Sequence, residues 1–458
     1  MDVSIIQDSL HGTIEVPFLC KQVIDTPQFD RLRSLKQLGC VHFVFPGGKH
    51  TRWEHSLGVM HLAGKLVRKL QADPSRNISE VDVLCVMLAG LCHDLGHGPF
   101  SHTWEAFVKE ARKGHNWCHE ETSIKMFEYL LTDNKLKNSF EDNGLLEKDI
   151  TFIKEMIRSI SLDEAEDWPY VGRGPEKYFL YEIVANKTTG MDVDKMDYFK
   201  RDDAALGTGT KFNFERYILT TSTKQDARGR TKLCIRDKEL SNVQNLFCDR
   251  VSLHKAGYQH KTCLIINRML LDALLLADDH LYEGTMKLSE ACDDVEKFIE
   301  LSDERIFREI QFSRNDNPQM QEAKQILMRI IKRELYKSVG KIEFCGEIGA
   351  TAEFKINAEE VDGMHMNELI LINKSVNMGG DKKINPVKNV QFIDKAGDNV
   401  KFNDNQLKQG LPPQVNYEEL IIVSKRKKCN ESDEKYFEKL SSKFSNKVGY
   451  SVHPKSQK

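Results

Sequence analysis

Two histidines and two aspartates in three separated segments have the residue types of a metal site. His93 and Asp94 lie in the run LCHDLGHGPFSH, His55 lies upstream in RWEHSLGV, and Asp194 lies downstream in DVDKMDYF. Two imidazoles and two carboxylates can hold one divalent or transition metal ion and leave coordination positions open for water and substrate. Mixed nitrogen and oxygen ligands do not distinguish Fe, Mn, Zn and Mg. The set predicts metal-assisted hydrolysis of a phosphate ester.

A structural role in the core is the alternative for His93-Asp94, because the dipeptide alone is common. Its position favours the metal site: the pair follows VDVLCVMLAGLC, a segment too apolar to hold an uncompensated carboxylate at low cost. A cation is the simplest compensation. The C-terminal end of a helix also carries a partial negative charge, which favours a cation beside the pair.

Further titratable side chains follow the metal motif and could transfer protons. An imidazole can protonate a leaving oxygen, and a neighbouring carboxylate fixes its tautomer and raises its basicity. Two dyads are candidates, His102 with Glu105 and His119 with Asp94 or Glu120. His97 fits a catalytic role and a structural one equally well.

Two later segments could bind a phosphorylated sugar. Spacings of three and four place Asp194, Tyr198 and Arg201 or Asp202 near one helix face, with Lys195 beside them. An ordinary charged amphipathic helix is the alternative. The next segments are dense in cationic and imidazole side chains, for which polyphosphate is a natural partner, although a solvated surface explains about half of them equally well. They contain Arg236, Lys238, Arg250, His254, Lys255, Tyr258, His260 and Lys261.

Apolar residues at helical spacing run from residue 25 to about residue 336, which predicts a mainly helical region. Thr51 and Glu54 form a predicted capping box, so His55 falls in the first turns of the helix that follows. Ser79 and Asp82 open a second helix, apolar nearly all round and therefore central. That helix must end near residue 96, because Gly98-Pro99 cannot continue it.

The composition and the spacing of apolar residues change along the rest of the chain. Residues 131–180 are polar and loop-rich, with one short helical piece, and fit a flexible insertion beside the site. After about residue 340, short β-prone runs (KIEFCGEI, TAEFKINA, ELILINKS, NVQFID and EELIIVSK) predict strands, and ESDEKYFEKLSSKFSNK predicts a surface helix. We therefore expect a mainly α fold: a helical bundle over residues 1–340 and a smaller C-terminal α+β lobe over residues 341–458.

Composition narrows the class of protein. The 458 residues carry a net charge of -3, so no global positive field attracts nucleic acid. No secretory leader or apolar stretch long enough to span a membrane is visible, so no membrane partner is expected. The 11 cysteines include no CxxC pair, which fits reduced thiols in the cytoplasm or nucleus.

The ordered motifs RWEH, LCHDLGHGPFSH, CHEE, DVDKMDYFKRD and HKAGYQHK resemble the HD-domain phosphohydrolases. Among these, the chain is most similar to the deoxynucleoside triphosphate triphosphohydrolases that also carry a sterile-alpha-motif (SAM) module, from about residue 5 to beyond residue 425. The resemblance implies cleavage of a dNTP at its α-phosphate into deoxynucleoside and triphosphate. The ligands of the metal would be His55, His93, Asp94 and Asp194, with proton transfer by His102, Glu105 and His119.

The resemblance also implies binding residues. Those for the substrate are Gln37, Leu38, Arg52, Lys195, Tyr198, Asp202, Arg250, His254, Tyr258 and Gln259. The family is a homotetramer activated by GTP and a dNTP, with Mg²⁺ bridging the nucleotide phosphates. Its allosteric nucleotide positions correspond to Asp25, Arg33, Val44, Phe45, Arg216, Arg236, Lys238, His260, Lys261, Arg333, Lys337 and Lys395.

Several positions depart from the family pattern. Ser4 replaces a phosphate-binding Lys, Gln7 an Asn, Thr13 a His and Asp30 a Gln, which should weaken nucleotide activation. Glu105 stands where Asp is usual. We also expect the protein to lack the SAM module and the Thr-Pro phosphorylation site of the family's C-terminal tail. The family otherwise implies lowered dNTP pools, antiviral defence and a nuclear location.

Two other functions stay open at the level of sequence. A catalytically weak homologue could act as an innate-immune scaffold that binds single-stranded nucleic acid through the basic residues near Arg236 and Lys261. The complete metal and proton-transfer sets and the net charge of -3 argue against it. The metal set alone also fits an HD phosphohydrolase that acts on cyclic or alarmone nucleotides.

Overall fold

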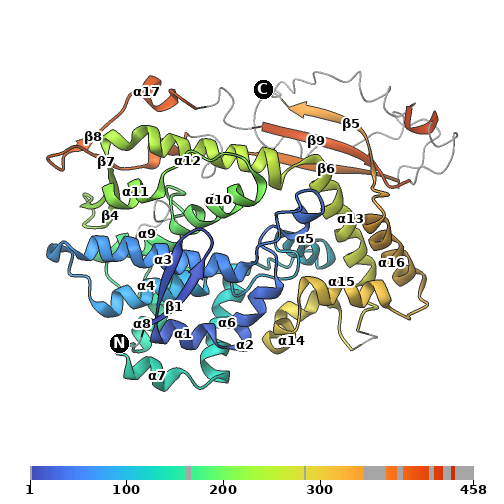
Figure 1. The fold of residues 1–458 in the computed structure, drawn as a ribbon, viewed down its shortest axis with the longest axis horizontal. Helices are drawn as coiled ribbons and strands as arrows, with labels where there is room; N and C mark the ends of the chain where they lie inside the picture. The colour runs from blue at the N-terminus through green and yellow to red at the C-terminus, as the bar shows by residue number, and fades with distance from the viewer. Residues whose placement is uncertain are drawn as a thin grey trace, which may run out of the picture.

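Helices make up most of the chain, as the sequence predicts (Figure 1). The computed structural model describes residues 3–160, 162, 167–282, 285–344, 368–378, 385–411, 417–426 and 435–438. The buried apolar side chains form one continuous cluster that runs from Ile14 to Val423. None of the described helices is both long enough and apolar enough to cross a membrane.

The helices of the first half surround the predicted site. They are α1 (Phe18–Ile24), α2 (Pro27–Asp30), α3 (Arg52–Gln71), α4 (Glu80–Cys92), α5 (His102–Ala111), α6 (His119–Asp133), α7 (Lys137–Asp142), α8 (Glu147–Arg158), α9 (Tyr178–Val184) and α10 (Val193–Leu206). The later helices are α11 (Phe214–Thr220), α12 (Leu240–Leu253), the π-helical turn η7 (His254–Tyr258), α13 (Lys261–Ala277), α14 (Val295–Ile299), α15 (Asp303–Phe312), α16 (Pro318–Ile331) and α17 (Asp404–Lys408).

Helices α3 and α4 pack together at the centre, and both begin as predicted. The Glu54 carboxylate accepts the Thr51 N–H at 2.9 Å, and the Asp82 carboxylate accepts the Ser79 N–H at 2.9 Å, so both capping boxes are present. Helix α4 is buried along almost all of its length, because its side chains are apolar on every face. It also packs against α8, and α3 packs against α10.

Two expectations about helices are wrong. Helix α4 ends at Cys92 and not near residue 96, since the chain turns through His93 to Gly96. In the region 131–180 the predicted helical piece corresponds to α8, but a second helix, α7, lies in the run expected to be a loop. Helix α8 buries Phe152, Ile153, Met156 and Ile157, so its amphipathic face belongs to the core.

The strands form three small sheets. A hairpin pairs β1 (Val3–Asp8) with β2 (Gly12–Pro17). A four-stranded sheet has the order β3 (Thr221–Gln225), β4 (Thr231–Arg236), β7 (Phe392–Ile393) and β8 (Asn399–Val400). A three-stranded sheet has the order β5 (Lys337–Phe344), β9 (Tyr417–Ser424) and β6 (Leu369–Val376).

Four of the five predicted C-terminal β-runs contain strands, and the sheets cross the expected domain boundary. Residue 340 lies inside β5, and β7 pairs in parallel with β4 of the preceding region. Figure 1 shows the three-stranded sheet above α13 and α16. The predicted strand TAEFKINA lies outside the described residues, as does the surface helix ESDEKYFEKLSSKFSNK except for residues 435–438.

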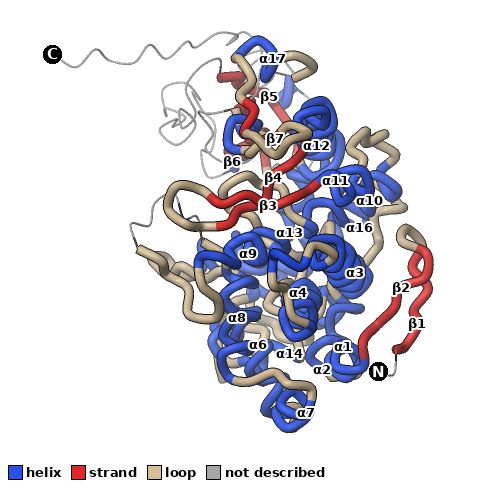
Figure 2. The backbone as a smooth tube through the Cα atoms, turned by 90° about the vertical axis from the view of Figure 1, so that its left-hand side faces the viewer, coloured by secondary structure: helices blue, strands red, loops and turns tan. Residues whose placement is uncertain are grey.

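The β1–β2 hairpin lies at the edge of the helical body, beside α1 and α3 (Figure 2). Its turn residue His11 faces His61 on α3, with their ring centroids 5.4 Å apart. Burial, together with the charges of His11 and Lys65, lowers the pKa of His61 to about 4. The folded chain therefore disfavours a charged His61.

A pH dependence of stability follows for His61. Between about pH 6.5, where an unfolded His titrates, and about pH 4, the unfolded chain binds more protons than the folded one. The free energy of unfolding should therefore fall as the pH drops through this window. His61→Gln should make the fall shallower in urea unfolding curves, whereas the control His280→Gln, at an exposed pair with Gln319, should leave it unchanged. Equal slopes for all three proteins would contradict this role.

Candidate functional site

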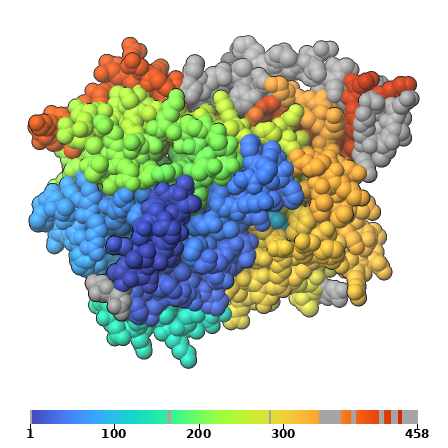
Figure 3. Space-filling model, in the orientation of Figure 1, coloured from blue at the N-terminus to red at the C-terminus, as the bar shows by residue number. Residues whose placement is uncertain are grey.

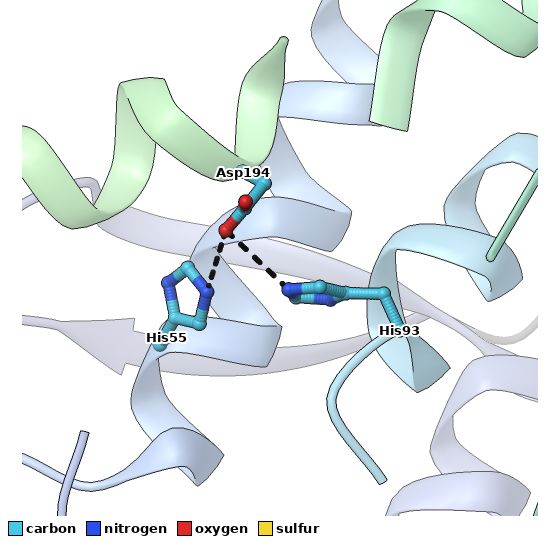
Figure 4. Close-up of side chains that lie close together, drawn as sticks. All are labelled: His55, His93 and Asp194. Atoms are coloured by element: carbon cyan, nitrogen blue, oxygen red, sulfur yellow. Dashed lines mark ion pairs between the residues drawn. The ribbon is translucent and has the colours of Figure 1, made fainter. Parts of the chain in front are cut away.

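Three predicted metal ligands converge between helices α3, α4 and α10 (Figure 4). Asp194, in the first turn of α10, points one carboxylate oxygen at both imidazoles. Its Oδ1 lies 3.1 Å from His55 Nε2 and 3.5 Å from His93 Nε2. Asp94 completes the group, with Oδ1 3.3 Å from His93 Nε2 and Oδ2 3.6 Å from His55 Nε2.

The outer nitrogens fix the tautomers of the two histidines. His55 Nδ1 lies 2.8 Å from Asp197 Oδ2, and His93 Nδ1 lies 2.8 Å from the Gly90 carbonyl oxygen. Because carboxylate and carbonyl oxygens only accept hydrogen bonds, both Nδ1 atoms carry the proton. Each Nε2 then faces the carboxylates and is the nitrogen that could give a lone pair to a metal ion. Neither Nε2 atom has a hydrogen-bond partner within the described part of the chain.

This arrangement fits a metal ion. Burial lowers the pKa of both imidazoles, but the neighbouring carboxylates outweigh it: they raise the pKa of His55 to about 10 and that of His93 above its usual value. These groups therefore favour positive charge among them, which a metal ion would supply. Ligand atoms about 2.1 Å from an ion lie roughly 3.0–3.4 Å apart, and the four distances here run from 3.1 to 3.6 Å. His55, His93, Asp94 and Asp194 could therefore hold one ion, and this donor set accepts several metals.

A second cluster of imidazoles adjoins this group. The Glu105 carboxylate accepts from His119 Nδ1 at 2.6 Å and from His102 Nδ1 at 3.1 Å. The His97 ring stacks on the His119 ring with centroids 3.9 Å apart, and His97 Nε2 lies 3.4 Å from Asp94 Oδ1. The sequence pairs His102 with Glu105, and the structure adds His119 to the same carboxylate. His119 Nδ1, the atom that contacts Glu105, also lies 3.7 Å from Glu120 Oε2.

The charge states of this cluster are set by burial and contacts. Burial raises the pKa of the Glu105 carboxyl, but hydrogen bonds from His102 and His119 outweigh it and hold that pKa well below its usual range. Burial, together with the nearby Arg52 charge, keeps the pKa of His97 well below its usual range. Glu105 is therefore anionic and accepts hydrogen bonds from both imidazoles, whereas His97 stays neutral.

Arg52, the first residue of α3, connects Asp94 to Ser101 in the turn between α4 and α5. Arg52 is buried, donates from Nη1 to Asp94, and donates from Nε to Ser101 Oγ at 3.1 Å. Phe100 and Ser101 both adopt a positive φ, a rare conformation for residues with side chains, and the Asp303 carboxylate accepts the Phe100 N–H at 2.7 Å. In this structure the Arg52 guanidinium supports a predicted metal ligand.

The predicted sugar-binding residues form a group around Asp202. This buried carboxylate accepts from the Tyr258 hydroxyl and from His50 Nε2, the latter at 2.7 Å. Arg250 Nη1 donates to the Tyr198 hydroxyl at 3.3 Å, and His254 packs edge-on to Tyr258. Lys195 instead donates to Asp192 at 2.7 Å.

Several predicted substrate residues keep buried polar atoms that have no hydrogen-bond partner among the described residues. Such atoms are costly unless a ligand or water satisfies them. They are Gln37 Oε1, Arg250 Nε, His254 Nδ1 and Gln259 Oε1. Gln259 also donates to the Ser375 carbonyl of β6, which directs its amide nitrogen to the C-terminal sheet. Leu38 lies on the loop before α3, near Gly48.

The predicted allosteric residues lie in separate places along the surface of the chain. Arg33 stacks over the Trp53 ring at 3.5 Å and binds Asp30 at 2.9 Å, and Asp25 pairs with Lys21. Phe45 contacts the His260 ring, and Arg333 donates to the Phe43 carbonyl at 2.8 Å. Val44 lies on the α2–α3 loop and Arg216 on α11. Arg236 ends β4 and Lys238 follows it, while Lys261 begins α13 and Lys337 begins β5. Lys395 lies in the β7–β8 turn.

Three residues close to these groups were missed from the sequence. Asp197 accepts from His55, His11 contacts Asp197 from the β1–β2 turn, and His50 contacts Asp202. Asp197 carried a signal, since it lies one helical turn after Asp194 on α10. His11 and His50 lie in loops far along the sequence from their partners, and spacing alone gives no signal for such contacts.

Comparison with known proteins agrees with this geometry. The HD domain family matches residues 52–201. The chain is 43% identical to the deoxynucleoside triphosphate triphosphohydrolase SAMHD1 of Gallus gallus, covering 93% of this chain and 72% of that protein. It is also 43% identical to the Homo sapiens protein of that name, over 92% and 70% of the two chains, and 34% identical to a Dictyostelium discoideum homolog, over 95% and 80%. The chain therefore belongs to the family of HD-domain deoxynucleoside triphosphate triphosphohydrolases.

Proposed function

We propose that this protein hydrolyses a dNTP to a deoxynucleoside and inorganic triphosphate. The convergence of His55, His93 and Asp194, with both imidazole Nε2 atoms facing the carboxylates, carries the proposal. Relatives named as dNTP triphosphohydrolases, 43% identical over more than nine tenths of the chain, supply the substrate class. The source of substrate would be the nuclear or cytoplasmic dNTP pool, which the activity would lower.

The residues of the two clusters have complementary tasks in this reaction. When bound, the metal ion supplies positive charge that polarises the α-phosphate and makes water more acidic. His119 holds its Nδ1 proton against Glu105, so its Nε2 can deliver a proton to the leaving 5′ oxygen. His102 holds the second oxygen of Glu105 and keeps the carboxylate oriented. His97, stacked on His119, limits the movement of that ring.

The group around Asp202 would select the sugar. Its carboxylate and Gln37 would bind the 3′-hydroxyl, while Tyr258 and Leu38 would exclude a 2′-hydroxyl by steric contact. His50 and the Tyr258 hydroxyl both bind Asp202 and so fix the position of this group. Arg250, with an unpartnered Nε among the described residues, would bind the phosphates together with Lys195 and Arg52. His254 and Gln259 would line the same pocket.

Regulation by nucleotides is a finer part of the proposal. A homotetramer would bind GTP and a dNTP, with bridging Mg²⁺, at the predicted allosteric residues. The Asp30 carboxylate accepts a hydrogen bond from Arg33 Nε at 2.9 Å, and the neutral Ser4 side chain offers no positive charge to a triphosphate. Both features should weaken the guanine-nucleotide site, because a carboxylate there competes for the cation. Activation by GTP should therefore be weak.

The direct test is to incubate the purified protein with each dNTP, with and without GTP, and to measure triphosphate and oligomeric state together. We expect triphosphate as the product and little additional activity with GTP. Release of pyrophosphate or of single phosphates, or no hydrolysis of any dNTP under either condition, would contradict the proposed reaction. Strong dependence on GTP would contradict the proposed weakening of the first activator site.

A further inference from the structure

The β1–β2 hairpin lies on the molecular surface but is fastened to the interior at its turn (Figure 3, dark blue). In the middle of β1, Ile5 is 71% exposed. At the turn, His11 Nε2 lies 2.6 Å from Asp197 Oδ1, and Asp8 accepts from Arg201 Nη1 at 3.1 Å. The hairpin thus buries Ile14 and Val16 of β2 in the core and inserts two polar side chains at its turn into the contact region between α3 and α10.

The contact formed by His11 is fully buried. The His11 side chain is 2% exposed and the Asp197 side chain is 0% exposed. Because a carboxylate only accepts, His11 Nε2 carries the proton and donates it to Oδ1. Arg201 donates to both oxygens of Asp197, each at 2.9 Å, and His55 Nδ1 donates to Oδ2 at 2.8 Å. Four hydrogen bonds from three side chains fix the plane of this carboxylate.

The neighbouring helix is shaped to admit Asp197. A Cβ atom at Gly58 of α3 would lie 1.8 Å from Asp197 Oδ1 and 2.8 Å from Arg201 Nη2. Any other residue at position 58 would push the carboxylate away from both imidazoles. The glycine therefore allows Asp197 to approach α3 closely enough to reach His55 from one side while His11 reaches Asp197 from the hairpin.

We infer that His11 and Asp197 are positioning residues for the metal ligand His55, so that the surface hairpin is part of the metal centre. Asp197 holds the proton on His55 Nδ1 and aims Nε2 at the metal position, and His11 holds Asp197 in the orientation that does so. The inference rests on the proposed metal-dependent function. It adds that the seating of residues 3–17 sets the metal affinity, and by linkage that metal binding stabilises the seated hairpin.

The test measures metal binding itself. The full chain is stripped of metal with chelator and titrated with Mn²⁺, and the dissociation constant is followed by electron paramagnetic resonance. His11→Ala should weaken Mn²⁺ binding about 10- to 100-fold, the usual range for residues that support a metal ligand. His11→Gln, which keeps an N–H donor near the Nε2 position, should recover part of the loss. The control Ser9→Ala, an exposed residue of the same turn, should bind Mn²⁺ like the parent.

A second measurement needs no substitution. Amide hydrogen exchange across the β1–β2 ladder should slow when Mn²⁺ is added to the parent chain. Equal Mn²⁺ constants for the parent and His11→Ala, or hairpin exchange that Mn²⁺ does not change, would overturn the inference. Triphosphate release by the same parent preparation separates the two proposals. If the parent releases triphosphate but the Mn²⁺ results contradict the inference, the hydrolase proposal still stands. If the parent releases no triphosphate, the hydrolase proposal itself is contradicted.

Discussion

Asp194→Ala is expected to lower triphosphate release by at least about 1000-fold and to abolish tight Mn²⁺ binding. Asp194 Oδ1 is the carboxylate oxygen that faces both imidazole Nε2 atoms, at 3.1 and 3.5 Å. Without it, two imidazoles and Asp94 remain, and Asp94 is already paired with Arg52. Loss of a direct ligand should exceed the roughly 10- to 100-fold effect of outer residues, because the positive charge that activates water is lost with the ion.

The fold should survive this substitution, which makes the result interpretable. The Asp194 side chain is 29% exposed and, among the described residues, pairs with no arginine or lysine, in contrast to Asp94, whose removal would leave the Arg52 guanidinium unpaired. A matched control is Glu215→Ala, which removes an exposed carboxylate paired with Lys65. Calorimetric melting and Mn²⁺ titration of both variants are the measurements. Normal Mn²⁺ affinity in Asp194→Ala would exclude this residue as a ligand.

The four side chains proposed as metal ligands could be selected from the sequence because strong local signals lie beside two of them. The capping box of Thr51 and Glu54 places His55 at the start of α3, and the apolar run of α4 ends immediately before His93. Local signals of this kind depend on residues fewer than five positions apart. These signals identify which side chains face the core. The chemistry of those side chains then restricts which ligand or ion the core can bind.

The supporting contacts could not be predicted, because they join residues that only the tertiary fold brings together. His11 and Asp197 are 186 positions apart, and His50 and Asp202 are 152 positions apart. A histidine in a hairpin turn has the same local pattern whether it faces solvent or a buried carboxylate. Helix α7 was missed for a different reason: its six residues, KNSFED, are polar apart from Phe140, the one buried member, so no amphipathic pattern marks the helix.

His119→Asn is expected to lower kcat about 100- to 10,000-fold while Mn²⁺ binding stays unchanged. Asparagine can keep the hydrogen bond from the Nδ1 position to Glu105, but it cannot deliver a proton to a leaving oxygen. Hydrogen bonds from His102 and His119 outweigh burial and keep the Glu105 carboxyl anionic, so an asparagine at position 119 still meets a hydrogen-bond acceptor. Single-turnover measurements with a dNTP, set beside an Mn²⁺ titration of the same variant, separate proton transfer from metal binding.

His115→Asn is the matched control, because the same change is made four residues earlier at a partly exposed imidazole that only approaches Asp293, at 3.7 Å. It should retain the kcat of the parent. A substrate whose leaving group needs no proton, such as one with a 4-nitrophenolate leaving group, should restore much of the rate of His119→Asn, since the missing step is protonation of the leaving oxygen. Equal losses with both kinds of leaving group would instead assign His119 to positioning, and a loss of Mn²⁺ affinity would assign it to the metal centre.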